Sequence, residues 1–88
     1  MTTAVYHIER MHYQDGVLCL SESDNVVHLN PATAVKEVAK EMCLVRDTSE
    51  GDLDGTFVEH PGPTWYAKIW DIDSGDPIIE WIIVPTVH

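Results

Sequence analysis

A tight turn between two strand-forming segments is the feature that most restricts how this chain can fold. Residues 65–72 and 76–84 are rich in β-branched and aromatic side chains. The Asp-Ser-Gly sequence at 73–75 between them suits a three-residue hairpin loop with its glycine in the left-handed conformation. The sequence therefore predicts a β-hairpin over the last third of the chain.

The register of this hairpin divides its side chains between two faces. If Ile72 pairs with Asp76, then Lys68 lies opposite Glu80. One face would then form the core, with six apolar residues: Trp65, Ala67, Ile69, Ile79, Trp81 and Ile83.

The second face of the hairpin is also apolar, because it carries Tyr66, Trp70, Ile78 and Ile82. Either more of the chain or a partner must cover such a face. Trp70, opposite Ile78, belongs to a second small core or is an aromatic anchor at a protein interface.

A single helix is predicted from Pro31 to about Leu44. Asn30 can cap the free amide groups at its start, and Pro31 suits the first helical position because its missing N–H is not needed there. We expect one apolar stripe to pack on a sheet: Val35, Val38, Ala39 and Met42. The charged stripe would face solvent: Lys36, Glu37, Lys40 and Glu41.

Three short strands are expected before the helix. Residues 5–13 alternate apolar and polar side chains, Asp15-Gly16 supplies a turn, and residues 17–20 and 26–29 follow as strands. The whole chain, residues 1–88, then forms a single compact α+β domain. Its fold is an antiparallel β-sheet of about five strands with one α-helix, at about 31–44, packed on one face.

Negative charge is concentrated after the helix. Five Lys and Arg residues against fifteen Asp and Glu residues give a net charge of −10, of which −7 lies beyond Leu44. A loop is expected there with five carboxylates, and the hairpin turn adds three: Asp47, Glu50, Asp52, Asp54 and Glu59, then Asp71, Asp73 and Asp76. This charge argues against direct binding to nucleic acid or an anionic membrane.

Two interpretations of these carboxylates remain open. They solvate loops and keep the protein soluble, as most charge runs do. Alternatively, a spaced array of carboxylates imitates a phosphate backbone and docks on a Lys/Arg-rich surface that normally holds nucleic acid.

Other chemistry has weaker support in the sequence. Residues 50–55 partly match a calcium loop, but Pro61 stands where the closing Glu should be. No nucleophile, cofactor or metal motif occurs, so we expect no enzymatic activity, cofactor or metal site. The histidines are scattered along the chain: His7, His12, His28, His60 and His88.

Two further features concern the setting of the protein. Cys19 and Cys43 are expected to be buried thiols rather than a disulfide. No basic leader followed by an apolar stretch opens the sequence, and the longest apolar run, 81–84, is far short of a membrane span. A cytoplasmic location is predicted.

Three segments together resemble the small acidic phage-encoded anti-CRISPR proteins: the strand at 4–9, the amphipathic helix at 34–43 and the hairpin at 65–84. The resemblance lies in layout, covers most of the chain and transfers no residue by position. It implies inhibition by binding a CRISPR effector complex and blocking its contacts with target DNA or guide.

The leading hypothesis is a non-enzymatic inhibitor that binds a Lys/Arg-rich protein surface, with Trp70 as an apolar anchor beside the eight carboxylates. Alternatives are an immunity protein or antitoxin against a basic nuclease, or a calcium-binding or structural module. Monomer and homodimer both remain open.

Overall fold

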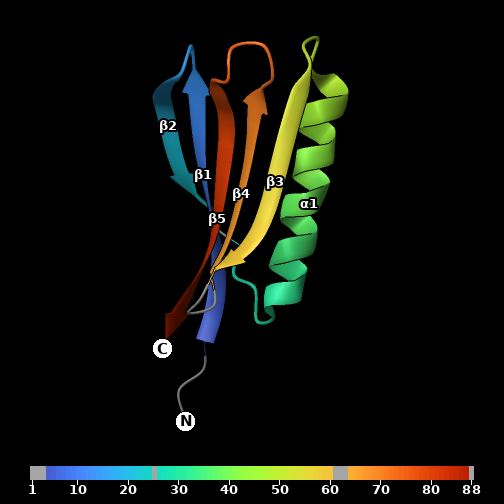
Figure 1. The fold of residues 1–88 in the computed structure, drawn as a ribbon. Helices are drawn as coiled ribbons and strands as arrows, with labels where there is room; N and C mark the ends of the chain where they lie inside the picture. The colour runs from blue at the N-terminus through green and yellow to red at the C-terminus, as the bar shows by residue number, and fades with distance from the viewer. Residues whose placement is uncertain (1–3, 25, 61–63, 88) are drawn as a thin grey trace.

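Five antiparallel strands and one helix make up the computed structural model, which describes residues 4–24, 26–60 and 64–87 (Figure 1). The sheet order is β2-β1-β5-β4-β3, and the α+β architecture predicted from the sequence is confirmed. The elements along the chain are β1 (Ala4–Gln14), β2 (Val17–Ser23), α1 (Pro31–Thr48), β3 (Leu53–His60), β4 (Thr64–Asp71) and β5 (Pro77–Val87).

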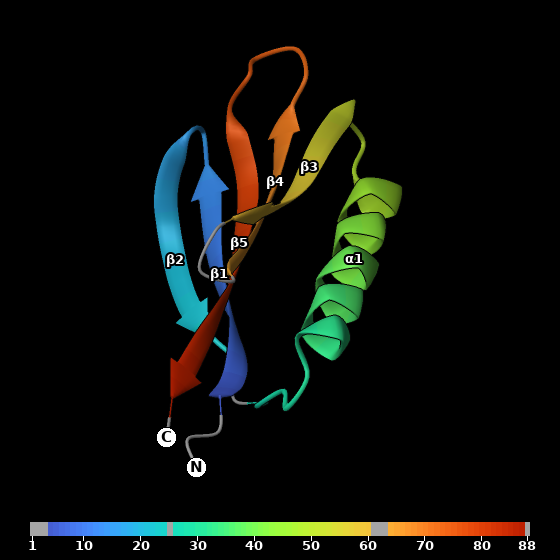
Figure 2. The same ribbon diagram turned by 60° about the horizontal axis from the view of Figure 1, so that its bottom comes forward.

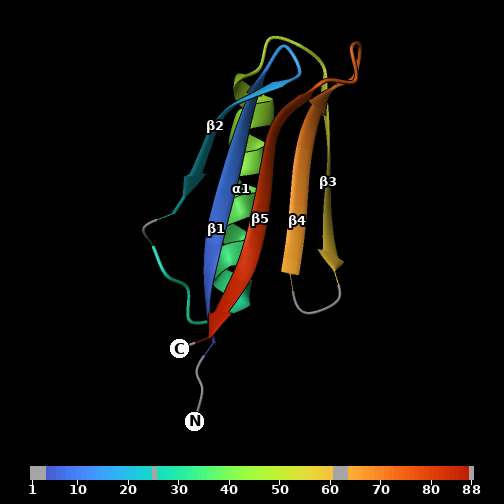
Figure 3. The ribbon, with the colours of Figure 1, turned by 90° about the vertical axis from the view of Figure 1, so that its left-hand side faces the viewer.

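The helix crosses from one edge of the sheet to the other and covers a single face. It follows the edge strand β2 and leads into the opposite edge strand β3, beside which it lies in Figure 2. In the view of Figure 3, α1 lies behind β1 and β5, and the helix covers the sheet from that side only. The sheet therefore has a covered face and an open face.

The predicted helix cap is confirmed, while the helix extends further than expected. Asn30 Oδ1 accepts a hydrogen bond from Ala32 N at 2.9 Å, and Pro31 opens the helix. The helix continues past Leu44 to Thr48, whose hydroxyl donates to the carbonyl of Leu44 at 2.9 Å. The additional turn brings Val45 against the core.

The inward stripe of α1 is confirmed at Val35, Val38 and Met42, which pack in or against the core, and it differs from the prediction at two positions. Ala34 and Val38 are fully buried, whereas Ala39, which we expected to face the sheet, is exposed. Glu41, which we expected to face solvent, points to the sheet, where Arg10 and Trp81 hydrogen-bond its carboxylate. A carboxylate is tolerated there because these partners satisfy it.

The core forms between α1 and the covered face, on the face of the hairpin predicted from its register. Lys68 lies opposite Glu80, as expected, and Trp65 packs at the border of the core. The buried core residues are Ile8, Ala34, Val38, Ala67, Ile69, Ile79, Trp81 and Ile83.

The hairpin register slips by one residue near the turn. Asp71 N donates to Asp76 O at 2.9 Å, so these two residues, and not Ile72 and Asp76, close the loop. Trp70 consequently pairs with Pro77 rather than Ile78, and a bulge at this point restores the predicted register. Gly75 has the left-handed φ of 75° that the sequence predicted.

Two predictions about the connections are wrong. Residues 26–29 do not form a strand; only His28 bridges to Tyr6, because the Asp24 side chain accepts from Val26 N and turns the chain. The expected acidic loop before His60 is instead half strand, since β3 begins at Leu53. Its alternation places Phe57 toward the helix and Asp54 on the open face.

Candidate functional site

Three turns bring most of the predicted acidic residues to one end of the molecule, at the top of Figure 1. The turn after α1 meets the β4–β5 loop, because Ile72 N donates to Asp52 O at 3.0 Å. Two glycines show how close the turns lie to one another. A Cβ atom added to Gly51 would lie 3.6 Å from Asp71 Oδ2, and one added to Gly16 would lie 3.2 Å from Asp76 Oδ1. We name this surface the acidic end: Asp15, Asp47, Glu50, Asp52, Asp54, Asp71, Asp73 and Asp76.

The fold orders the β4–β5 part of the acidic end. Asp71 Oδ1 accepts hydrogen bonds from Asp73 N at 2.8 Å and Ser74 N at 3.1 Å. Ser74 in turn accepts from Asp76 N at 3.2 Å. Asp73 and Asp76 are exposed, so their carboxylates are available to a partner on a loop with a defined shape.

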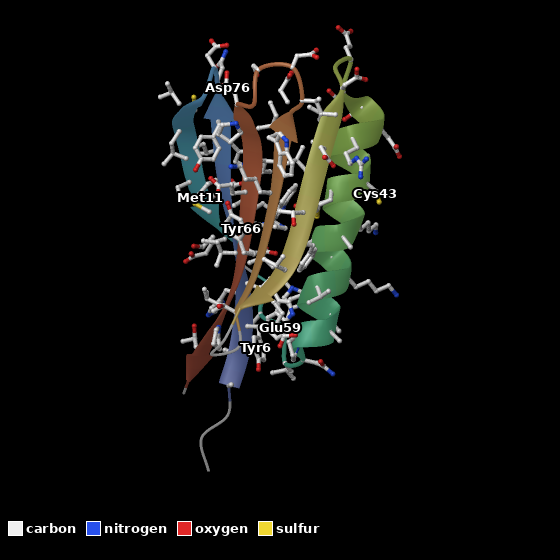
Figure 4. All side chains as sticks on the ribbon, in the orientation of Figure 1. Tyr6, Met11, Cys43, Glu59, Tyr66 and Asp76 are labelled. Atoms are coloured by element: carbon white, nitrogen blue, oxygen red, sulfur yellow. The ribbon has the colours of Figure 1, made fainter. Side chains whose placement is uncertain are left out.

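Two predicted site residues lie apart from the others. Glu59 is near the far end of β3, in the lower half of Figure 4, whereas Asp76 is at the top. Trp70 is partly buried on the open face and pairs with Asp54, which joins that face to the acidic end. Asp15, in the turn between β1 and β2, belongs to the acidic end although sequence reasoning assigned it only to a turn.

A shallow pocket of about 420 Å³ lies where α1 meets β3. Arg46 lines this pocket. Among the described residues, it is the one Lys or Arg side chain at the acidic end. The full lining is Cys43, Arg46, Asp47, Gly51, Asp52 and Leu53.

Both cysteines are free and exposed, so the prediction of buried thiols is wrong. Cys19 lies on β2, an edge strand whose residues are all exposed, and Cys43 lies on the solvent side of α1 (Figure 4). Neither residue reaches the covered face, which explains its exposure.

Carboxylates at the acidic end are spread out rather than focused on one point. Among residues 4–24, 26–60 and 64–87, no three His, Cys, Asp or Glu side chains are arranged to hold a metal ion. His28 bonds Thr33 Oγ1 through Nδ1 at 2.9 Å, and His12 contacts Glu22 at 3.1 Å. His88 lies outside the described residues. The separated carboxylates of the acidic end suit contact with an extended surface.

A polar cluster under the helix was not predicted from the sequence. Arg10 Nε donates to Glu41 Oε1 at 2.6 Å, and a second guanidinium nitrogen donates to the other carboxylate oxygen. Trp81 Nε1 donates to Glu41 Oε1 at 3.2 Å, and Asp24 lies 3.5 Å from the guanidinium. Since β1, β5 and α1 each contribute one partner, this cluster fixes the helix on the sheet.

The pKa of Glu41 lies below its ordinary value of 4.5. Burial alone would raise this pKa, but the hydrogen bonds from Arg10 and Trp81 and the charge of Arg10 outweigh burial. The same contacts raise the pKa of Arg10, chiefly through its hydrogen bonds to Glu41.

On the open face, two tyrosines share one carboxylate. The hydroxyl of Tyr66 donates to Glu80, and the hydroxyl of Tyr13 is also hydrogen-bonded to Glu80. Burial and then this hydrogen bond raise the pKa of Tyr66, and the hydrogen bond is the main cause of the raised pKa of Tyr13. Strands β1, β4 and β5 are thereby joined by side chains as well as by backbone.

We expect Glu80→Gln to lower the pKa of both Tyr66 and Tyr13, because the carboxylate that opposes their ionisation is gone. An alkaline titration of tyrosinate absorbance would measure the shift. Glu9→Gln, on the same face, is the matched control and should leave the titration unchanged. Equal curves for wild type and Glu80→Gln would contradict the shared carboxylate.

Comparison with models of protein families, with curated proteins and with solved structures finds no match for this chain. In the described part of the chain, no helix is long and apolar enough to cross a membrane.

Proposed function

We propose that this protein is a non-enzymatic inhibitor that binds, through its acidic end, a Lys/Arg-rich protein surface that otherwise holds nucleic acid. The observation that carries the proposal is the meeting of three acidic turns at one end of the molecule. Arg46 is the sole Lys or Arg residue described there, so little of the negative charge is neutralised locally.

The spacing of the carboxylates supports a protein partner of this kind. They come from the β1–β2 turn, the connection from α1 to β3 and the β4–β5 loop. In the described part of the chain, none of them forms an ion pair with a Lys, Arg or His side chain. Such an array can meet several Lys and Arg side chains at once, as a phosphate backbone does. Attraction between the two surfaces would speed association and weaken with salt.

The partner class we propose is a CRISPR effector complex, on the basis of the resemblance in layout to small acidic anti-CRISPR proteins. Binding at its basic channel would exclude target DNA. In this setting the protein would act in the cytoplasm of a host cell and would need no cofactor.

A DNA-displacement assay tests the proposal. Purified effector complexes of several types, loaded with guide RNA, are mixed with labelled target DNA and increasing amounts of this protein. We expect one of them to lose DNA, and the triple variant Asp52→Lys, Asp73→Lys, Asp76→Lys to inhibit about 100-fold less well, at roughly 1 kcal/mol for each reversed charge.

A second triple variant separates location from net charge. Glu22→Lys, Glu37→Lys, Glu59→Lys makes the same change in charge at exposed sites outside the acidic end. This variant should retain most of the inhibition. An equal loss in both variants would contradict a local docking surface, and neutralisation of a basic nuclease without any effect on effector complexes would favour an immunity protein instead.

A further inference from the structure

The open face of the sheet is too apolar to be explained by contact with water alone. Its residues alternate along each strand with the buried ones, so Ile82, for example, lies between the buried Trp81 and Ile83. We define the open face by six partly exposed side chains from three adjacent strands: Met11, Tyr13, Tyr66, Trp70, Ile82 and Val84. Figure 4 shows Met11 and Tyr66 on the side of the sheet away from α1.

We propose that a second copy of this chain covers the open face, so that two sheets pack face to face with the helices outside. This proposal is independent of the function proposed above. Three strands at a spacing of about 4.8 Å, each about ten residues long, give a face of roughly 480 Å². Two such faces bury about 950 Å² in total, the size of a weak, reversible interface.

The small net charge of this face keeps the repulsion between two copies low, and the position of the acidic end sets their direction. At the centre of the open face stand Glu9, Glu80 and Lys68, a net charge of −1 (1 − 2), compared with −10 for the chain. The acidic end lies at one end of a molecule 49 Å long. With the two-fold axis perpendicular to the strands, the two acidic ends point in opposite directions, separated by far more than the Debye length of about 8 Å at physiological salt.

The free edge of β2 is a less suitable place for a second copy. All of its residues are exposed, including Leu18 and Leu20. However, the register between β1 and β2 shifts after His12, and such a bulge bends an edge strand and interrupts regular pairing with another strand. The bulge that β5 carries lies at its start, near the turn, and the rest of the open face over β1, β5 and β4 has no comparable obstacle.

Sedimentation equilibrium over nanomolar to millimolar chain concentrations tests the proposal. We expect the wild type to reach the mass of two 9.9 kDa chains. Ile82→Lys, at the centre of the open face, should weaken association by at least tenfold while circular dichroism remains unchanged. Ile82→Ser serves the same purpose if the lysine variant does not fold.

Two matched variants place the same charge elsewhere. Leu44→Lys lies on the outside of α1 and Leu20→Lys on β2, at side chains that are 63% and 52% exposed. Both should associate as the wild type does. A wild type with the mass of one chain at every concentration would overturn the proposal, and so would loss of the dimer in Leu20→Lys but not in either Ile82 variant.

Discussion

Replacing Trp81 by alanine is expected to lower the free energy of unfolding by about 3–5 kcal/mol, a large part of the roughly 5–15 kcal/mol that stabilises a domain. Trp81 is the largest fully buried side chain, with 0% of its surface exposed. It lies on β5, between Arg10 of β1 and Ala67 of β4. Truncation leaves a cavity under α1 and removes the indole N–H that binds Glu41.

Urea denaturation followed by far-ultraviolet circular dichroism measures this loss. Trp70→Ala is the matched control, because Trp70 is only partly buried and lies on the open face. Its substitution should cost about 1 kcal/mol, in the range of ordinary surface and border positions. A smaller cost for Trp81→Ala than for Trp70→Ala would mean that the core is not centred on β5.

Replacing Glu41 by alanine is expected to cost about 2–3 kcal/mol. Breaking a buried ion pair from one side typically costs 3–5 kcal/mol, and the smaller value allows for a Glu41 side chain that is 24% exposed. The variant leaves the guanidinium of Arg10 and the indole N–H of Trp81 without their acceptor. Asp24, at 3.5 Å, recovers only part of the interaction with Arg10.

A double-mutant cycle shows whether Arg10 and Glu41 act together. Arg10→Met combined with Glu41→Met should cost less than the sum of the two single substitutions, because neither charge is then left without a partner. Additive losses would show that the two side chains are not coupled.

Acid titration gives an independent measure of Glu41. Because its pKa in the folded state is lowered, the stability that it contributes is complete above its ordinary pKa of 4.5 and is lost as pH falls through the lower folded value. Below about pH 4.5, we expect the free energy of unfolding to fall less steeply with pH in Glu41→Gln than in the wild type. Parallel curves would contradict the contribution of this carboxylate.

Local signals were sufficient to predict the C-terminal hairpin and the start of the helix. Alternating apolar residues on β4 and β5 identified the buried face, and Asn30 with Pro31 marked the N-terminus of α1. These features depend on residues close together in the sequence. Prediction succeeded there because the local preference and the final fold agree.

Longer-range features could not be predicted in the same way. Glu41 faces the sheet because Arg10 and Trp81, 31 and 40 residues away, supply its hydrogen bonds. Acidic residues in β3 suggested a loop, although the alternation of Leu53, Gly55 and Phe57 was a usable strand signal. The bulge in β5 follows from the closure of the loop by Asp71 and Asp76, which residue preferences alone do not specify.

The pairing of β1 with β5 has a consequence for the order of folding. These neighbouring strands lie far apart in sequence, since Ala4 is opposite Val87, whereas the β1–β2 hairpin and the β3–β4–β5 meander are both local. Each local unit can form early, but joining them requires closing a loop that spans most of the described chain, which is an entropically slow step. Newly synthesised chains therefore hold β1 without its second neighbour until β5 has been made, and the core around Trp81 assembles only then.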